Sequence, residues 1–321
     1  RGLCPHVKNP AFDAGIIFFY GKRKRMIMAG LMSGGCCILM VIFPQVAMDS
    51  ARKGISLWAS SVLPALLPFF ICANFLQNIG VIRYLKSGTF PFLMSVLSGY
   101  PMGAKIVGDL RRSSEISVGE AKRLMSFCST SGPAFLIGAV GTGMLGSGFL
   151  GGIIAAAHYL GAAVNGMVYT AVLGKECGFA GSMRIEEEKG MQESLTEAML
   201  SAFKSLGIIL AYIVLFTFAT DMMHLCGVFS LVGCTWLRAI VKGFFEMTVG
   251  CGAVAECVGI SDALRCILCA GILSWGGLSV LGQSMSMLAG SGISLRYLFL
   301  SKMTHSLFSA IIAFLLAALM V

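Results

Sequence analysis

Long apolar stretches separated by short polar segments follow one another from residue 26 to the end of the chain. Within residues 97–147, small and turn-forming residues stand where a membrane helix would be uniformly apolar. Pro101 removes a backbone donor, and Gly99 and Gly103 favour a reversal of the chain. The next apolar run carries in its middle Ser129, Thr130, Ser131, Gly132 and Pro133. This pattern predicts a helical hairpin followed by a broken helix.

A break of this kind has a functional meaning in a membrane. Backbone interrupted at bilayer depth is tolerated only where protein or a water-filled cavity satisfies its polar groups. In transporters such breaks surround the substrate site. We therefore expect the substrate to contact the five break residues and the tip of the preceding hairpin, which comprises Ser98, Gly99, Tyr100, Pro101 and Gly103.

The second half of the chain has the same order of elements. Each half has a long span, an interrupted stretch, a broken helix, a Gly-Ser-Gly turn and a final span, and at one constant offset Gly132 falls on Gly276. The second hairpin tip contributes Glu246, Thr248 and Gly250, and the second break contributes Ser274, Gly276, Gly277, Ser279 and Gln283. These halves predict inverted repeats, with Gly132 and Gly276 close together around a pseudo-twofold axis in the membrane plane.

This organisation predicts an all-α polytopic membrane protein with about seven crossings plus two re-entrant hairpins. The expected parts are a basic segment (1–25), a first transmembrane helix (26–53, apolar over 26–48), a first repeat (54–173), a charged linker (174–194) and a second repeat (195–321). The distribution of Lys and Arg between the spans places the N-terminus in the cytoplasm. Because the chain begins with Arg1 and Met26 opens the first span, the true start is open between them.

Composition supports the membrane interpretation. The chain is 57% hydrophobic and 12% charged, with a mean hydropathy of +0.85, whereas soluble domains are roughly 45–50% apolar and about 25% charged. The net charge of +9 comes from scattered residues, which argues against a nucleic-acid partner and for the lipid bilayer. The cysteines in apolar runs are expected to be reduced, and the Cys266/Cys269 spacing lacks the second motif of a metal site.

Several polar residues allow more than one interpretation. Glu246, among apolar neighbours, is either a proton carrier, cation ligand or substrate partner, or the structural partner of Lys242. Ser131 resembles an N-cap whose half-helix would attract an anion, although break hydroxyls also bond neighbouring helices. Lys105 either binds a carboxylate or extends to the surface. His305 is a proton relay or simply hydrogen-bonded, and Glu256 and Lys302 are weaker candidates.

Four segments carry a resemblance to a known family, namely SGYPMGAK, EAKRLMSFCSTSGPAFLIGAVGTGMLGS, FFEMTVG and ILSWGGLSVLGQ. The chain from residue 26 onward resembles the sporulation integral membrane proteins of the YlbJ or SpoVV type, which carry nucleoside-transporter gate domains. The resemblance implies a relation to concentrative nucleoside transporters, in which paired hairpins and broken helices surround a midplane site. It also implies dipicolinate as the cargo, moved from the mother cell toward the forespore.

Two departures from the nucleoside transporters change what the resemblance implies. Their Gln-Thr-Glu type cluster is absent from the first hairpin, and Val249 stands beside Gly250 where an Asn is expected. Sugar recognition and sodium coupling are therefore not carried over.

The sequence favours a transporter of a small organic solute, most of all dipicolinate across a forespore membrane. A nucleoside or nucleobase transporter and a non-transporting spore-envelope assembly protein are the alternatives. An enzyme is not expected, because the chain has four His and no HExxH or GxSxG motif. No cofactor is expected beyond a coupling ion, H⁺ or Na⁺, and a homo-oligomer remains open.

Overall fold

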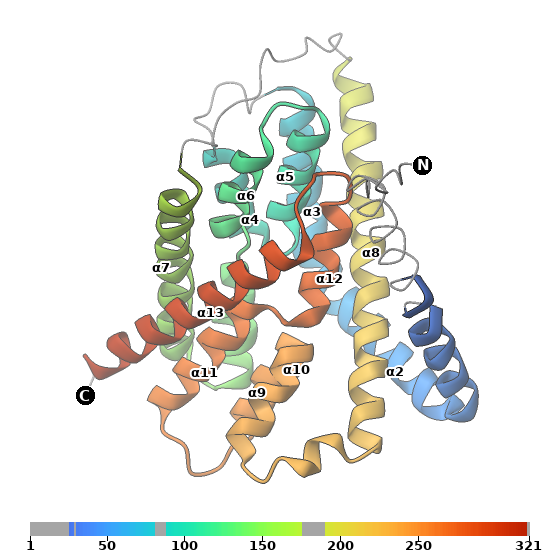
Figure 1. The fold of residues 1–321 in the computed structure, drawn as a ribbon, viewed down its shortest axis with the longest axis vertical. Helices are drawn as coiled ribbons and strands as arrows, with labels where there is room; N and C mark the ends of the chain where they lie inside the picture. Colours follow the sequence, from blue (N-terminus) through green and yellow to red (C-terminus); the bar gives the residue numbers. More distant parts are fainter. Residues whose placement is uncertain (1–25, 29, 81–87, 175–189, 320–321) are drawn as a thin grey trace, which may run out of the picture. The chain divides into compact units, whose positions relative to one another are not determined.

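The computed structural model describes residues 26–28, 30–80, 88–174 and 190–319. The chain divides into two compact units, Arg1–Asp49 and Ser50–Val321. The described residues form helices and connecting turns without strands, as Figure 1 shows, which confirms the predicted all-α class. The basic segment before Met26 and most of the charged linker lie outside the described residues.

The first span is not the continuous helix that we predicted over residues 26–48. Helical segments Met26–Ile42 and Pro44–Ser60 are bent by 105° relative to each other. Pro44 explains the bend, because it lacks the N–H that would continue the helix and because proline is favoured at the first position of a new one.

The two halves contain matching elements. The first half consists of α2 (Pro44–Leu57), the π-helical η1 (Trp58–Val62), α3 (Leu63–Asn78), α4 (Thr89–Ser98), α5 (Met102–Arg112), α6 (Val118–Phe127), the π-helical η3 (Ala134–Met144) and α7 (Gly148–Leu173). The second half consists of α8 (Met191–Leu225), the 3₁₀ helix η5 (Val228–Leu231), α9 (Thr235–Phe245), α10 (Met247–Ala255), α11 (Asp262–Trp275), α12 (Gly277–Met287) and α13 (Leu295–Ala318). In each half a pair of short helices is followed by a helix in two pieces and a long final helix.

Serine side chains fix where four of these helices begin. Ser117, Ser147, Ser261 and Ser294 each accept a hydrogen bond from the backbone N–H three residues later, at the first turns of α6, α7, α11 and α13. Such a cap satisfies one of the N–H groups that a helix leaves without a partner. In the first of the two Gly-Ser-Gly turns, the serine is therefore the N-cap of α7.

In the described part of the chain, four helical stretches are long and apolar enough to cross a membrane, namely Gly148–Leu173, Met191–Leu225, Asp262–Met287 and Leu295–Ala318, and a fifth is present if the bent pair counts as one span. Seven crossings stay a prediction. Helices α4, α5, α9 and α10 have 9 to 11 residues each, about half the length that a crossing requires.

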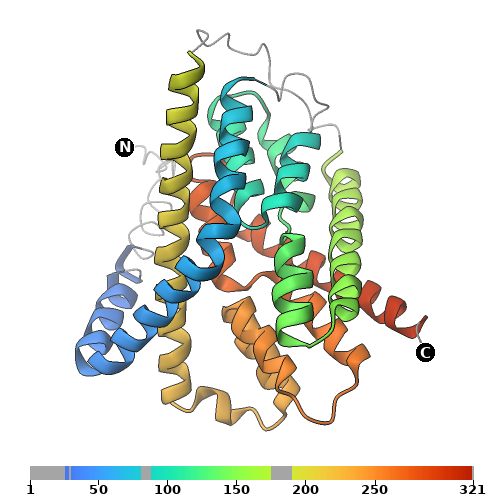
Figure 2. The same ribbon diagram turned by 180° about the vertical axis from the view of Figure 1, so that it is seen from behind.

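In each half, one piece of the broken helix packs on the hairpin of the other half. Helix α12 of the second half packs on α5 of the first hairpin, and η3 of the first half packs on α10 of the second hairpin. The final helices α7 and α13 also contact each other extensively, and η3 lies beside α7 in both views (Figures 1 and 2). Each of the two apolar cores therefore contains residues from both halves.

The second hairpin generates a prediction about packing. Helices α9 and α10 cross so closely that a Cβ added at Gly250 would lie 2.3 Å from the Cα of Gly243. Gly250→Ala should therefore lower the free energy of unfolding by about 1–3 kcal/mol, measured by thermal melting in detergent. Gly252→Ala, on the same helix, meets no atom within 4 Å and should melt at or above the parent temperature. Equal melting of the two variants would contradict this packing.

Candidate functional site

Each hairpin tip touches the break of its own half through a glycine. Gly99 has a φ of 81°, and a Cβ there would lie 2.7 Å from the backbone nitrogen of Gly132. Gly277 has a φ of 82°, and a Cβ there would lie 2.9 Å from the carbonyl oxygen of Phe245. Only glycine combines this backbone conformation with such a close approach. The predicted tip and break residues are thus brought together within each half.

The first break is held by side chains of α7 and not by its own serine. Helix α6 ends at Phe127, and η3 begins at Ala134 with Pro133 in the N-cap position and no side-chain cap. The predicted N-cap role of Ser131 is therefore wrong. Its N–H donates to Nε2 of His158 (2.9 Å), and its carbonyl accepts from the Tyr159 hydroxyl (2.9 Å). Because α7 satisfies both groups, this part of the break can remain non-helical.

Ser95 ties the first hairpin to the same break. Its hydroxyl donates to the carbonyl of Cys128 (2.6 Å) and accepts from the N–H of Thr130 (3.2 Å). The hydroxyls of Ser95 and Thr130 lie 2.8 Å apart. The other helix of the hairpin, α5, also packs against the break, because a Cβ added at Gly103 would lie 1.7 Å from the Cys128 carbonyl oxygen.

A single imidazole ring joins the two breaks. Since the Ser131 N–H donates to Nε2 of His158, Nε2 must be an acceptor, and the hydrogen of the neutral ring is on Nδ1. Nδ1 therefore donates to the hydroxyl of Ser274, 2.7 Å away on α11. His158 is thus a neutral bridge between the two breaks, whereas the pseudo-twofold axis relating Gly132 and Gly276 stays a prediction.

Lys302 on α13 contacts the first hairpin and the first break. Its ammonium donates to the Tyr100 hydroxyl and to the carbonyl of Ser129 (3.0 Å), and it lies 4.3 Å from the centroid of the Tyr100 ring. The Tyr100 hydroxyl in turn donates to the carbonyl of Leu273 (3.1 Å), near the end of α11. Through Tyr100, the first hairpin tip is therefore bonded to the second broken helix.

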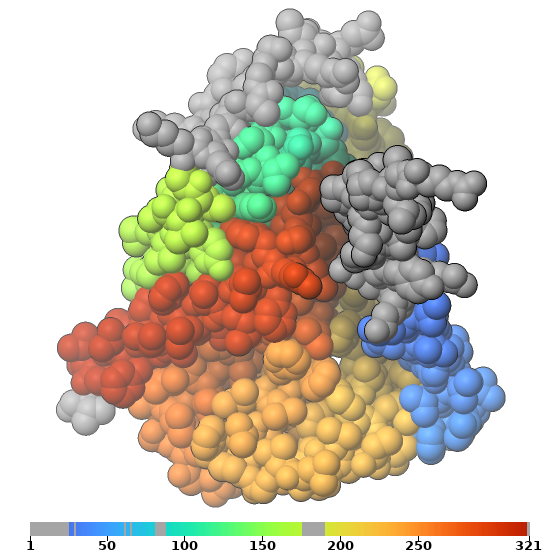
Figure 3. Space-filling model, viewed as in Figure 1, coloured from blue at the N-terminus to red at the C-terminus, as the bar shows by residue number. Residues whose placement is uncertain are grey.

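We refer to these connected residues as the central cluster, which comprises Tyr100, Ser129, Ser131, His158, Tyr159, Ser274, Lys302 and His305. His305 belongs to it because its Nε2 donates to the carbonyl of His158 (3.0 Å). Six of the eight members are less than 6% exposed, Tyr100 is 8% exposed and Tyr159 is half-buried. In the space-filling view, α12 and α13 cover the middle of one face of the second unit (Figure 3).

The second break turns at two consecutive glycines. Gly276 and Gly277 both have left-handed backbone, with φ values of 83° and 82°. Trp275, the last residue of α11, donates its indole N–H to the carbonyl of Phe244 (3.0 Å) and so bonds the break to the second hairpin. Ser279 and Gln283 are buried, but they bond to each other within α12 (3.2 Å).

Glu246 has a structural explanation that the sequence interpretation missed. Its carboxylate caps α10, accepting from the N–H of Val249 (2.8 Å) and from the Thr248 hydroxyl (3.2 Å). The proposed pairing with Lys242 is wrong, because the Lys242 ammonium lies over the Phe229 ring, 5.6 Å from its centroid. A carboxylate at a helix N-terminus is favourable because it compensates the unpaired N–H groups.

The remaining predicted residues also have defined places. Pro101 precedes α5, and Gly250 packs against Gly243 inside the second hairpin. Of the two alternatives for Lys105, extension to the surface is wrong. Its side chain is buried and bonded to Asp109 (2.8 Å). In the described ranges no group of three or more His, Cys, Asp or Glu side chains could hold a metal ion.

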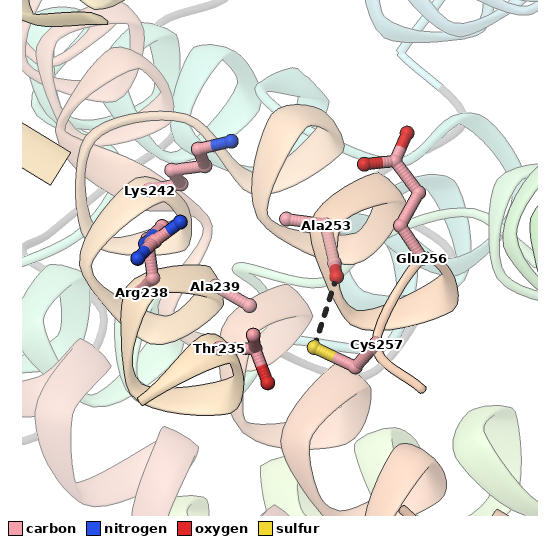
Figure 4. Close-up of a pocket in the computed structure, with 7 residues that line it drawn as sticks. All are labelled: Thr235, Arg238, Ala239, Lys242, Ala253, Glu256 and Cys257. Carbon is pink, nitrogen blue, oxygen red and sulfur yellow. Dashed lines mark hydrogen bonds between the residues drawn. The ribbon is translucent and has the colours of Figure 1, made fainter. Parts of the chain in front are cut away.

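A surface pocket of about 140 Å³ lies on the second hairpin (Figure 4). It is lined by Thr235, Arg238, Ala239, Lys242, Ala253, Glu256 and Cys257. Lys242 of α9 and Glu256, the residue that follows α10, carry their charges on opposite walls. The weaker candidate Glu256 lines it, but no residue of the central cluster and none of the expected hairpin-tip and break residues does, so it is separate from the central cluster.

The bridge between the breaks leads to a stability prediction. Replacing His158 by Leu would leave the buried Ser131 N–H without its acceptor and the Ser274 hydroxyl without its partner. His158→Leu should therefore lower the free energy of unfolding by about 2–4 kcal/mol, measured by SDS titration in mixed micelles. His224→Leu is the control, because His224 is exposed at the end of α8. An equally small effect of both substitutions would show that the bridge does not stabilise the fold.

Comparison with known proteins places the chain among membrane proteins. It is 27% identical over 323 residues to the sporulation integral membrane protein YlbJ of Bacillus subtilis (strain 168), and the alignment covers 86% of this chain and 79% of the relative. No protein-family model matches the chain. No solved structure matches it. The apolar helices and this relative identify an integral membrane protein, and the resemblance to sporulation integral membrane proteins of the YlbJ type is confirmed.

Proposed function

We propose that this protein is a membrane transporter that moves a small organic solute past the junction of its two broken helices. The observation that carries the proposal is the bridge from Ser131 through His158 to Ser274, which brings both breaks to one buried polar cluster. Interrupted helices that meet within apolar spans are the arrangement in which transporters hold substrates.

The free-energy cost of burying the ionisable side chains of the central cluster favours transport over a purely structural function. His158 lies in α7 and Lys302 in α13, and both helices are long and apolar enough to cross a membrane. Ionisable side chains in such helices are expensive and mark substrate or ion pathways by default. A membrane protein that only assembles the spore envelope could use His158 to hold its breaks together, but it does not need a buried ammonium such as that of Lys302. That function is nevertheless the alternative that the experiment below must exclude, since the relative's name states sporulation and no activity.

Dipicolinate is the substrate that we propose, across a forespore membrane of a spore-forming bacterium. A pyridine dicarboxylate is planar and accepts hydrogen bonds, and the cluster offers donors from Lys302 and from serine hydroxyls. A nucleoside is the second candidate, supported by the paired hairpins and broken helices alone. The proposal includes no catalytic step and no resident cofactor, and the coupling ion is H⁺ or Na⁺.

The hairpin tips are the parts that would open the site. Both tips lie against the breaks in the structure, and Tyr100 bonds the first tip to α11. Release of one tip would expose the cluster to one side of the membrane. Alternate release of the first and second tips would then carry a solute across.

Uptake into vesicles tests this function directly. Vesicles containing the purified protein should accumulate labelled dipicolinate above protein-free vesicles, with the rate changed by a proton or a sodium gradient, whichever ion is coupled. Labelled uridine is the comparison substrate. Uptake of uridine alone would establish the nucleoside alternative, and uptake of neither compound under any gradient would overturn the transport proposal.

The first break supplies a variant for the same assay. A Cβ at Gly132 would meet Gly99 and Leu97 at 3.5 Å, so alanine fits and a larger side chain would separate tip from break. Gly132→Leu should reduce uptake more than about tenfold, a loss of roughly 1.4 kcal/mol or more in transition-state terms, while the protein still elutes as one species. Gly138→Leu is the control, because Gly138 meets no atom within 4 Å. Parental uptake by Gly132→Leu would contradict a role of this junction.

A further inference from the structure

Two lysines are buried in the described part of this protein, and only one of them is paired with a carboxylate. Lys105 is 7% exposed and pairs with Asp109 at 2.8 Å. Lys302 is 3% exposed, and its ammonium bonds the neutral oxygens of Tyr100 and Ser129. No ion pair to Lys302 occurs among the described residues. The Tyr100 ring stabilises the ammonium by a cation–π contact, but it does not neutralise the charge.

Two serine hydroxyls without hydrogen-bond partners lie at the first hairpin tip and the first break. The Ser129 hydroxyl is buried without a hydrogen-bond partner, although the carbonyl of the same residue bonds Lys302. The Ser98 hydroxyl, at the end of α4, is also buried without a partner. The two residues are 5% and 4% exposed. Buried polar groups are nearly always satisfied, so an unsatisfied hydroxyl on the residue that bonds the cation, and another at the tip that meets this break, indicate a missing acceptor.

The chemistry of that acceptor follows from the donors. An ammonium offers three donors and no acceptor, and each serine hydroxyl offers one donor. An ionised carboxylate is an acceptor only and carries the charge that Lys302 lacks. An uncharged solute would satisfy the hydroxyls but leave the buried cation without compensation.

We propose that Lys302 is the counter-charge for a carboxylate of the transported solute, and that the Tyr100 hydroxyl occupies its place in the ligand-free protein. This inference deepens the proposed transport function and rests on it. When the first hairpin tip moves away, Tyr100 leaves both Lys302 and Leu273, and a carboxylate replaces its hydroxyl on the ammonium. Ser98 and Ser129 then donate to the same solute.

The neighbours of Lys302 in the cluster do not compete for the solute's charge. His158 is neutral because Nε2 accepts the Ser131 N–H. His305 donates through Nε2 to a backbone carbonyl, and Tyr159 donates its hydroxyl to another. Each of these side chains is a neutral group that holds backbone, whereas Lys302, which also bonds the Ser129 carbonyl, carries a positive charge that a ligand can use.

Calorimetric titration of the full-length protein in detergent tests the inference with pyridine-2,6-dicarboxylate and its uncharged diamide as probes. The parent should bind the dicarboxylate and not the diamide. Lys302→Met should weaken binding of the dicarboxylate by roughly 30-fold or more, as expected when a buried charge partner is removed. Lys105→Met is the matched control and should bind like the parent, because Asp109 keeps its bond to Arg112.

Two further measurements separate ligand binding from a structural role. Ligand-free Lys302→Met should melt close to the parent temperature, because losing the donor to the Ser129 carbonyl is offset by removing an uncompensated buried charge. Tyr100→Phe removes the hydroxyl that competes for the ammonium and should strengthen dicarboxylate binding severalfold. This variant decides the question if Lys302→Met does not fold, and unchanged or weaker binding by it would count against the inference.

The outcomes distinguish this inference from the transport proposal. Vesicle uptake by the parent with undiminished dicarboxylate affinity in Lys302→Met would leave transport standing and overturn the role of Lys302. Dicarboxylate binding that Lys302→Met loses, without uptake by the parent, would support the anion site and overturn transport. Equal affinity of the parent for the diamide and the dicarboxylate, or no binding of either, would overturn the inference.

Discussion

Backbone that leaves the helical conformation inside a membrane must find other hydrogen-bond partners, and this requirement organises the second unit. At the first break the partners come from α7 and α13, since His158 and Tyr159 engage both polar groups of Ser131 and Lys302 engages the carbonyl of Ser129. The short hairpins have the complementary function. A glycine on one side of each contact, Gly99 of the first tip and Gly277 of the second break, lets tip and break backbones approach closely. The two final spans, the breaks and the hairpins therefore depend on one another.

The sequence predicts the breaks because their causes are local. Glycine with left-handed backbone and proline without an N–H act at the position where they stand, so residues 98–103, 129–133 and 276–277 could be identified without any knowledge of neighbours. The Pro44 bend has the same kind of cause and was missed because the apolar run continues through it. The all-helical class followed from composition and the spacing of apolar runs.

The partners of the breaks could not be predicted, because they come from distant parts of the chain. His158 is a lone histidine in a Gly- and Ala-rich helix, and its contact with Ser274 spans 116 residues. Lys302 and Tyr100 are 202 residues apart. A polar residue inside an apolar span was the one available signal. The same signal identified Glu246 but not its capping of α10, and its expected role in transport stays a prediction.

The matching halves also show why one final span bears a charge and the other a neutral ring. At the offset that relates Gly132 to Gly276, His158 falls on Lys302, so α7 and α13 present their ionisable groups from equivalent positions. An imidazole has one acceptor and one donor and can link the N–H of one break to the hydroxyl of the other. An ammonium has donors only and cannot form that link. Divergence at this position thus separates two functions, with His158 holding the breaks together and Lys302 left with a charge that the described part of the protein does not neutralise.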